Sequence, residues 1–576
     1  MKVSEVLLQA VTEVESDGAD KKKTEARGPT QADILIKLAE TAALFHNPDG
    51  VGFADLNVNG HRETHPLRSK AFRRWLSRQF FNTTRGAPNA EAYASALNVI
   101  EAKAHFDFPE SPVHIRVAAC NGCIYIDLAD TSWRAIEIDS TGWRVVANPP
   151  VRFRRSAGML SLPEPTSGSS VAALRPYLNV KSDEDFVLAV AWVLAALRDC
   201  GPYPVLVLSG EHGTAKSTFA KILRALIDPS TTPLRALPRE DRDLFIAASN
   251  GHLLAFDNVS GLPAWISDTL CRLATGGGFA TRQLYSDQDE MLFDATRPII
   301  LNGIEDVVSR PDLADRSLFL TLEPIPETDR LPEARLWADF ERHRPAILGT
   351  LLDAMVVGLR LLPATNLSAL PRMADFALWA SACEAALWER DTFMNAYRAN
   401  LAEVIDNVLE ADAVAVAVRT LMSKRTIWTG NSTSLLGALG ELVSEATHKG
   451  KTWPSSPRAL GGRLRRCAPF LRKIGLNVTF AREGKARDRI VTIESGGIPS
   501  SAPSAPSAHK QEHNGSNGLE ADDRADTTVS IPESIVRPIV RPKPLRTDAA
   551  DATDAADANF PPLSGAEADE DESWTE

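Results

Sequence analysis

The loop at residues 210–217, with the sequence GEHGTAKS, combines the residue types and spacing that point most directly to chemistry. It follows a continuous apolar run at 205–208 and precedes an apolar-patterned segment at 217–227, so we expect a buried strand, the loop and a helix in that order. Backbone N–H groups at such a helix start, together with a lysine, are suited to hold phosphate groups. The pattern G-x-x-x-x-G-K-S is matched except at Ala215, which replaces the second glycine.

The chemistry expected of this loop is binding of ATP with Mg²⁺. Lys216 is expected to reach the β- and γ-phosphates, and Ser217 to bind Mg²⁺ through its hydroxyl. A methyl group at Ala215 is acceptable if the backbone there is right-handed. The residues expected to contact the nucleotide are Gly210, Glu211, His212, Gly213, Thr214, Ala215, Lys216, Ser217 and Thr218.

Three residues further along the chain extend this site. Asp257 ends a second apolar run, and its carboxylate suits Mg²⁺ opposite the phosphates, although strand ends often carry an ordinary aspartate. Asn302 ends a third apolar run, where its amide could orient the attacking water or sense the γ-phosphate. Arg316 precedes a fourth run at 318–322 and is placed like an arginine finger, which a neighbouring subunit supplies to neutralise transition-state charge.

These four elements, in this order, resemble the superfamily III helicases, an AAA+ branch that includes phage and poxvirus primase-helicases. The resemblance implies a P-loop core with a parallel sheet and assembly into a homo-oligomeric ring, for which a hexamer is one candidate. Residues 274–285 and 290–293 are similar to the family's Gly-Gly element and its pore hairpin. By that resemblance Arg282 and the hairpin tip at 286–288 would face DNA.

Two departures from the family bear on activity. Asn258 stands where AAA+ proteins usually carry a catalytic glutamate, and an amide can orient water but cannot accept its proton. The hairpin tip carries Asp287, Asp289 and Glu290, which would repel a phosphate backbone. The catalytic set predicted from the sequence is therefore Lys216, Asp257, Asn258, Asn302 and Arg316, without an assigned base.

A basic module is expected near the C-terminus. Residues 453–490 contain ten Arg or Lys against two acidic residues. A helix near 434–446, a second at 458–471 capped by Ser456, and two strand-like runs make a winged helix, resembling the module at the C-terminus of primase-helicases. A basic protein-binding module is the alternative. The DNA-binding residues predicted here are Arg458, Arg463, Arg466, Arg482, Lys485 and Arg487.

The N-terminal region has antiparallel patterning but no assigned chemistry. Cys120 and Cys123 could be half a zinc site or a redox pair, yet Asn121-Gly122 between them favours a hairpin turn. Asp127 and Asp130 lack the spacing of a polymerising site and are taken as strand-end residues. A basic helix at 67–81 could lie on a phosphate backbone, but a solvated face over a core stripe is the commoner explanation.

Charge and hydropathy organise the chain into five segments. They are an α+β accessory domain at 1–170, the α/β ATPase core at 171–330, a helical lid at 331–427, the winged helix at 428–497 and a disordered acidic tail at 498–576. Of the net charge of −12, the residues from 499 onward carry −10. No apolar run approaches the length of a membrane helix and no secretory signal is recognisable, so a cytoplasmic protein without a membrane partner is expected.

These features favour a Mg²⁺- and ATP-dependent, helicase-like motor acting on DNA in replication of a mobile element or phage-like locus. An ATP-gated DNA-binding switch with slow hydrolysis is the alternative that Asn258 favours. A small-molecule kinase explains neither Asn302 nor the winged helix.

The acidic tail is expected to compete with DNA for the basic module, because both present negative charge to the same arginines. Deleting the residues after Ile498 should therefore tighten DNA binding at low salt. Fluorescence anisotropy with labelled DNA measures this, and an unchanged affinity would contradict competition by the tail.

Overall fold

The computed structural model describes residues 28–277, 279–282, 290–293, 295–304, 307–308, 310–450, 453–483 and 488–496. The chain divides into two units, Met1–Pro503 and Ser504–Glu576. Only residues of the first unit are described, so the expected disorder of the tail lies outside them.

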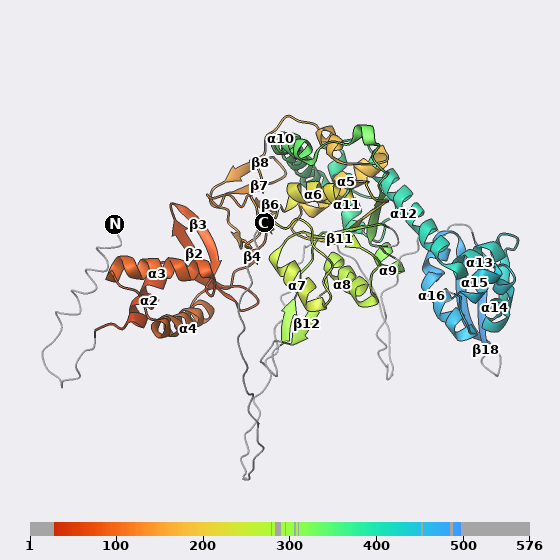
Figure 1. Ribbon diagram of the computed structural model, residues 1–576, viewed down its shortest axis with the longest axis horizontal. Helices are drawn as coiled ribbons and strands as arrows, with labels where there is room; N and C mark the ends of the chain where they lie inside the picture. Colours follow the sequence, from red (N-terminus) through yellow and green to blue (C-terminus); the bar gives the residue numbers. More distant parts are fainter. Residues whose placement is uncertain are drawn as a thin grey trace, which may run out of the picture. The chain divides into compact units, whose positions relative to one another are not determined.

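A four-stranded parallel sheet carries the predicted nucleotide loop (Figure 1). Each strand is one of the four apolar runs, because strands covered on both faces need apolar side chains on both. The spatial order is β11-β14-β10-β15, and each neighbouring pair is parallel. The strands are β10 (Val205–Ser209), β11 (Leu254–Val259), β14 (Ile299–Gly303) and β15 (Ser317–Thr321). The expectation of an α/β fold with a parallel sheet is confirmed.

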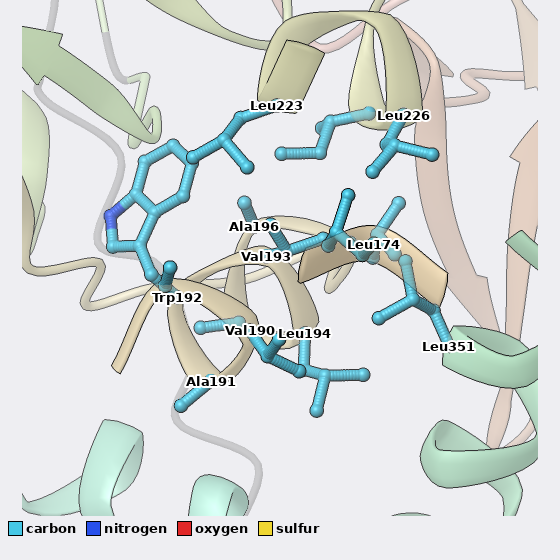
Figure 2. Packing of buried hydrophobic residues seen from close by; sticks show 14 of the residues in the cluster. Leu174, Val190, Ala191, Trp192, Val193, Leu194, Ala196, Leu223, Leu226 and Leu351 are labelled. Carbon is cyan, nitrogen blue, oxygen red and sulfur yellow. The ribbon is translucent and has the colours of Figure 1, made fainter. Parts of the chain in front are cut away.

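Helices pack a large apolar cluster against this sheet. In α5 (Asp183–Ala196) every residue from Phe186 onward is buried, which explains its uniformly apolar sequence. Figure 2 shows Leu223 of α6 (Lys216–Ile227) facing Trp192 of α5. The same cluster includes residues of the 3₁₀ helix η1 (Val171–Tyr177) and of α10 (Glu333–Leu361). Helix α6, which begins at the loop, is thereby fixed along its length.

Helix α10 contradicts the expectation that no apolar run approaches the length of a membrane helix. The segment Glu333–Ala364 is long and apolar enough to cross a membrane by length and composition, and 56% of its apolar window is buried inside the protein. Its buried Arg344 donates to the carbonyl of Ala225 at 2.6 Å. More than half of this apolar segment is therefore covered by other parts of the protein. Further helices that precede α10 in the chain are α7 (Asp241–Asn250) and α8 (Ala264–Thr275), beside the sheet, and α9 (Pro311–Ala314). The helices α11 (Ala374–Glu384), α12 (Thr392–Ala411) and α13 (Ala413–Met422) follow it.

The N-terminal region forms two antiparallel sheets, β1-β2-β3 with helices beside it and β5-β6-β7-β8, and a parallel pair of short strands, β4 with β9. Its elements are α2 (Gln31–Ala39), β1 (Ala43–His46), β2 (Gly52–Val58), β3 (His61–Pro66), α3 (Lys70–Thr84) and α4 (Ala90–Phe106), then β4 (Val113–His114), β5 (Val117–Cys120), β6 (Cys123–Asp127), β7 (Ala135–Ile138), β8 (Trp143–Val146) and β9 (Arg152–Phe153). Cys120 and Cys123 face each other across the β5–β6 hairpin, and both thiols are free. Because Asn121 has φ 52° and Gly122 φ 79°, the turn between them is the predicted hairpin turn. The described residues contain no cluster of three or more His, Cys, Asp or Glu suited to a metal.

The carboxylates considered for catalysis in this region are held by arginines. Asp127 is 1% exposed and receives both Nε and an Nη of Arg155 at 2.9 and 2.7 Å. Asp130 accepts from Arg134 at 2.6 Å. These pairs give both carboxylates structural partners, in agreement with the strand-end interpretation.

A buried ion pair joins the N-terminal sheet to the core. Arg116 is fully buried, and its Nε donates to Asp228 Oδ1 at 3.0 Å while its other nitrogens donate to the carbonyls of Asp127 and Leu160. The second oxygen of Asp228 accepts the backbone N–H of His252 at 3.0 Å. Burial by itself would raise the pKa of Asp228, but the charges of Arg116, Arg224 and His252 together outweigh that effect and keep the pKa below its usual value.

The C-terminal elements are β16 (Ile427–Asn431), α14 (Ser432–Gly440), α15 (Glu445–Lys449), α16 (Pro457–Lys473), β17 (Leu476–Glu483) and β18 (Asp488–Ser495). The helix near 434–446 is therefore two shorter helices, and β16 was not predicted. Ser456 caps α16 as expected, accepting the N–H of Ala459 at 3.2 Å. The three strands are antiparallel in the order β16-β18-β17.

The pH dependence of stability should report the buried His252. Its Nε2–H donates to the carbonyl of Ala196 at 2.6 Å, and burial with the nearby Arg297 charge lowers the pKa of His252 to about 4. As the pH is lowered, His252 of the unfolded chain binds a proton near pH 6.5, whereas His252 of the folded chain does so only near pH 4. The free energy of unfolding therefore falls by about 3 kcal/mol as the pH is lowered through this interval. Urea unfolding at a series of pH values measures the slope.

His252→Gln should flatten this part of the profile, because glutamine does not titrate. His212→Gln, at an exposed position in the loop, serves as the control and should keep the wild-type slope. Equal slopes in wild type and His252→Gln would show that another group is responsible.

Candidate nucleotide site and basic surfaces

Three residues predicted from separate motifs meet at one edge of the parallel sheet. Ser217 Oγ lies 3.1 Å from each carboxylate oxygen of Asp257. Asn302 Nδ2 donates to Asp257 Oδ1 at 2.5 Å and to Ser217 Oγ at 3.1 Å. The carboxyl ends of parallel strands share one edge of a sheet, which is why β11 and β14 deliver Asp257 and Asn302 beside the loop that follows β10.

The side chain of Lys216 folds back onto its own loop and forms hydrogen bonds with it. Its Nζ donates to the carbonyls of Gly210 and Glu211, both at 2.7 Å, and to Thr214 Oγ1 at 3.3 Å. Burial lowers the pKa of Lys216, and the negative charge of Asp257 opposes that change. The ammonium group is therefore held by two backbone carbonyls and one hydroxyl, which a phosphate group could replace, and lies near enough to Asp257 to interact with its charge.

The backbone of the loop is left-handed where Ala215 replaces glycine. Ala215 has φ 59° and Gly213 φ 82°, so the right-handed backbone on which an acceptable methyl group at Ala215 depends is not present. The reason is local: Ala215 is the residue before α6 and must turn the chain from the loop into the helix. A left-handed alanine is strained because its Cβ approaches the following carbonyl.

Other features of the loop explain its shape. A Cβ on Gly210 would lie 2.4 Å from the carbonyl oxygen of Leu322, so only glycine fits there. Asn179, which sequence reasoning missed, donates to the carbonyls of Thr214 at 3.0 Å and Glu323 at 2.7 Å and so clamps the loop to the chain after β15. Asn179 lies outside any helix or strand, so no periodic pattern could have identified it.

Asn258 has a structural reason for its identity. Its φ is 56°, and the register of β11 against β14 shifts between Phe256 and Val259. Asparagine tolerates this left-handed conformation better than most residues, whereas a glutamate would be strained. The backbone N–H of Asn258 donates to Asp257 Oδ1 at 3.0 Å and helps to orient that carboxylate.

Arg316 is not brought to the nucleotide loop of its own chain. The N–H of Val205 donates to the carbonyl of Arg316 at 2.9 Å, which places Arg316 at the amino end of β10, whereas the loop follows the carboxyl end. The guanidinium forms an ion pair with Asp312 and donates to the Asp312 carbonyl at 2.8 Å. The side chain is 16% exposed.

The donor set fits a Mg²⁺-nucleotide. Hydroxyl and carboxylate oxygens are the protein ligands that Mg²⁺ prefers, and Ser217 and Asp257 present them side by side. The first turn of α6 has no side-chain cap, so its N–H groups and the positive end of the helix dipole are open to an anion. Lys216 adds a positive charge at the same place.

A cleft of about 1300 Å³ runs from this loop to the C-terminal helices. Gly210 and Glu211 line its one side, and Arg463 and Arg466 of α16 line another. Arg463 also pairs with Asp412, at 2.9 Å. Two of the arginines predicted to bind DNA thus face the core.

The other described arginines of the predicted set line a separate groove of about 400 Å³ between α16 and the β17–β18 hairpin. Arg458 and Arg482 lie there with Arg465 and Arg489, two residues that the predicted DNA-binding set did not include. Arg489 could have been found, because in an antiparallel hairpin it pairs directly with Arg482. Arg465 lies 4.7 Å from the ring centroid of Phe480.

The remaining predicted DNA contacts lie outside what the structure describes. Lys485, Arg487 and the hairpin tip at 286–288 fall in gaps between the described ranges. The backbone of β12 (Phe279–Arg282) pairs with β13 (Glu290–Phe293) as a hairpin, but the side chain of Arg282 is not among those described. Their roles stay predictions.

Comparisons with known proteins place most of the core and the C-terminal module in one group. Residues 171–407 match the family described as actinomycete integrative conjugative element replication protein, and residues 414–508 match the RepA C-terminal domain of the same elements. No curated protein matches the chain.

Solved structures give weak similarities only. The A form apo structure of the NrS-1 C-terminal region has 11% identity and a TM-score of 0.39, covering 80% of this chain and 99% of that one. A further apo structure of residues 305–718 of NrS-1 has 10% identity and a TM-score of 0.37, covering 82% of this chain and all of that one. These scores are too low to assign a fold.

Substitutions at Ala215 test the left-handed loop. Ala215→Gly removes the strained Cβ and should leave the free energy of unfolding unchanged or raise it by up to about 1 kcal/mol, because glycine's greater unfolded-state entropy offsets part of the relief. Ala215→Val should lower it by more than about 1 kcal/mol, since a β-branched side chain is worse at positive φ. Denaturant unfolding measures both, and equal stability of the two variants would contradict a left-handed Ala215.

Proposed function

We propose that this chain, which belongs to the replication proteins of actinomycete integrative conjugative elements, is a Mg²⁺- and ATP-dependent, helicase-like motor that acts on DNA during replication of the element. The observation that carries the proposal is the convergence of Ser217, Asp257 and Asn302 beside Lys216. A structural strand-end aspartate would explain Asp257 alone, but not the hydroxyl and the amide that meet it.

Each residue of this cluster has a distinct task in the proposed site. The N–H groups of α6 and the Lys216 ammonium would bind the phosphates, and Ser217 with Asp257 would hold Mg²⁺. When bound, Mg²⁺ would neutralise charge on the phosphate oxygens. Asn302 fixes the orientation of Asp257 and has an amide that can align a water molecule.

The C-terminal elements support contact with DNA. We interpret α16 with the β17–β18 hairpin as a winged helix, and the groove between them presents Arg458, Arg465, Arg482 and Arg489 to solvent together with Phe480. Four positive charges around an aromatic ring are suited to a nucleic-acid backbone.

The position of Arg316 supports a ring of identical subunits. At the amino end of β10 it cannot serve its own loop, whereas a neighbouring copy in a ring could receive it. Its ion pair with Asp312 would then have to exchange for the neighbour's phosphate.

A second candidate function is an ATP-gated DNA-binding switch with slow hydrolysis. Asn258 favours it, because the residue next to Asp257 lacks a carboxylate and its left-handed backbone disfavours one. The two functions share the ATP site and differ in turnover.

ATP turnover with and without single-stranded DNA distinguishes them. For the motor, DNA should stimulate hydrolysis, and Lys216→Ala should lower turnover by about 100-fold or more, because it removes charge stabilisation at the phosphates. Lys221→Ala, one turn along α6 and paired with Glu333, is the matched control and should retain turnover. Loss of ATP binding in Lys216→Ala, with neither DNA-stimulated hydrolysis nor strand displacement in wild type, would reject the motor and leave the switch.

Subunit mixing extends the same experiment to Arg316. If Arg316 acts on a neighbour, mixtures of Arg316→Ala and Lys216→Ala chains should recover activity at mixed interfaces, because one interface then has both an intact loop and an intact arginine. Activity equal to the sum of the separate variants would contradict action between subunits.

A further inference from the structure

Helix α3 in the N-terminal region has two chemically opposed faces. Phe72, Leu76 and Phe80 are buried in the local core. Lys70, Arg74 and Arg78 are exposed on the other side, one turn apart, so their positions rise by about 6 Å each along the helix. We call these three residues the α3 stripe.

The α3 stripe is not neutralised by the protein. The sequence of α3 contains no acidic residue, and in the part of the chain that the structure describes none of the three side chains forms an ion pair. Like charges four residues apart destabilise a helix. Other basic residues of the same region are paired: Arg68 with Glu101, Lys103 with Glu40, Arg134 with Asp130 and Arg152 with Asp55.

An exposed aromatic ring lies just beyond the C-terminal end of the stripe, on the same face of α3. Phe81 is 52% exposed, and at about 100° per residue it falls between Lys70 and Arg74 around the helix axis. Successive cations with an exposed ring are the combination that binds single-stranded nucleic acid, because the cations contact phosphates while an unpaired base stacks on the ring. A lipid surface would need the apolar face of α3, which is already buried.

We propose that the α3 stripe with Phe81 is a second DNA-binding site, which holds single-stranded DNA by phosphate contacts and base stacking. This site lies in a region that the family matches do not reach, since they begin at residue 171. It requires no nucleotide and is separate from the groove of α16, so failure of the ATPase proposal would leave it standing.

The test is fluorescence anisotropy of the full-length protein with a labelled single-stranded oligonucleotide, titrated at several salt concentrations without ATP. The combined variant Lys70→Gln, Arg74→Gln and Arg78→Gln should weaken binding about tenfold or more. The slope of log K against log salt should fall by about 2, since each phosphate contact to a single strand contributes about 0.7.

A matched control removes the same charge elsewhere in the region. The variant Lys37→Gln, Lys103→Gln and Arg144→Gln loses three positive charges outside α3 and should keep the wild-type slope. Equal losses in the two triple variants would overturn the site, because net charge alone would then explain them. The stripe variant should also melt no lower than wild type, since it removes repulsion within α3.

Phe81→Ala separates stacking from charge. It should weaken binding of the single strand several-fold and leave binding of a duplex of the same sequence unchanged, because bases in a duplex are not free to stack on the ring. Loss of both to the same extent would contradict a stacking role for Phe81.

The acidic tail is the other anionic occupant that the chain offers. The comparison of the stripe variant with wild type should therefore be repeated in two backgrounds. One is a chain ending at Ile498, and the other carries Arg458→Gln and Arg482→Gln, which remove two charges from the α16 groove. The stripe effect should persist in both backgrounds. Its disappearance in the shortened chain would assign the stripe to the tail, and its disappearance with the groove variant would assign the binding to α16; either overturns the proposal.

Discussion

The geometry of the candidate site depends on the buried carboxylate of Asp228. This residue directly follows α6, whose first turn carries Ser217, and it also binds the backbone N–H groups just before β11, which ends near Asp257. The side chain of Asp228 therefore fixes the C-terminal end of α6 and the start of β11. The opposite ends of these two elements carry Ser217 and Asp257, which must meet in the site. A buried carboxylate needs a compensating charge, and Arg116 supplies it from the N-terminal sheet. The accessory region thus contributes to the precision of the site without contacting it.

The sequence predicted the parts of the fold whose pattern is local. The four strands of the parallel sheet are legible because burial on both faces requires continuous apolar runs. The meeting of Ser217, Asp257 and Asn302 followed from the rule that parallel strands end at one edge. Strand β16 was not predictable, because it pairs with β18, about sixty residues further along the chain. The clamp by Asn179 was not predictable either, because its partner Thr214 lies 35 residues away. The left-handed turn at Ala215 was missed for a different reason, since alanine rarely adopts it.

In the basic module, composition predicts the charge of helix α16 but not the surface that each of its arginines lines. An excess of arginine predicted a charged helix correctly, yet charge count alone does not say which way a side chain points. Arg458 and Arg465 line the groove beside Phe480, whereas Arg463 and Arg466 line the cleft that reaches the nucleotide loop. A single helix therefore touches both surfaces. Lys473, at its end, forms an ion pair with Asp315, just before β15. Because α16 lines both the groove and the cleft, a displacement of this helix in the groove would also change the cleft.

The left-handed backbone at Asn258 also constrains how this protein can evolve. A lineage that gained from faster hydrolysis would need a carboxylate next to Asp257, and a single codon change to glutamate would place it on a backbone that disfavours it by about 1 kcal/mol or more. Removing the shift in register between β11 and β14 would require a further change in the strand. The intermediate sequences would be less stable before they were more active. Such a chain would be separated by a fitness valley from variants that carry a carboxylate at this position.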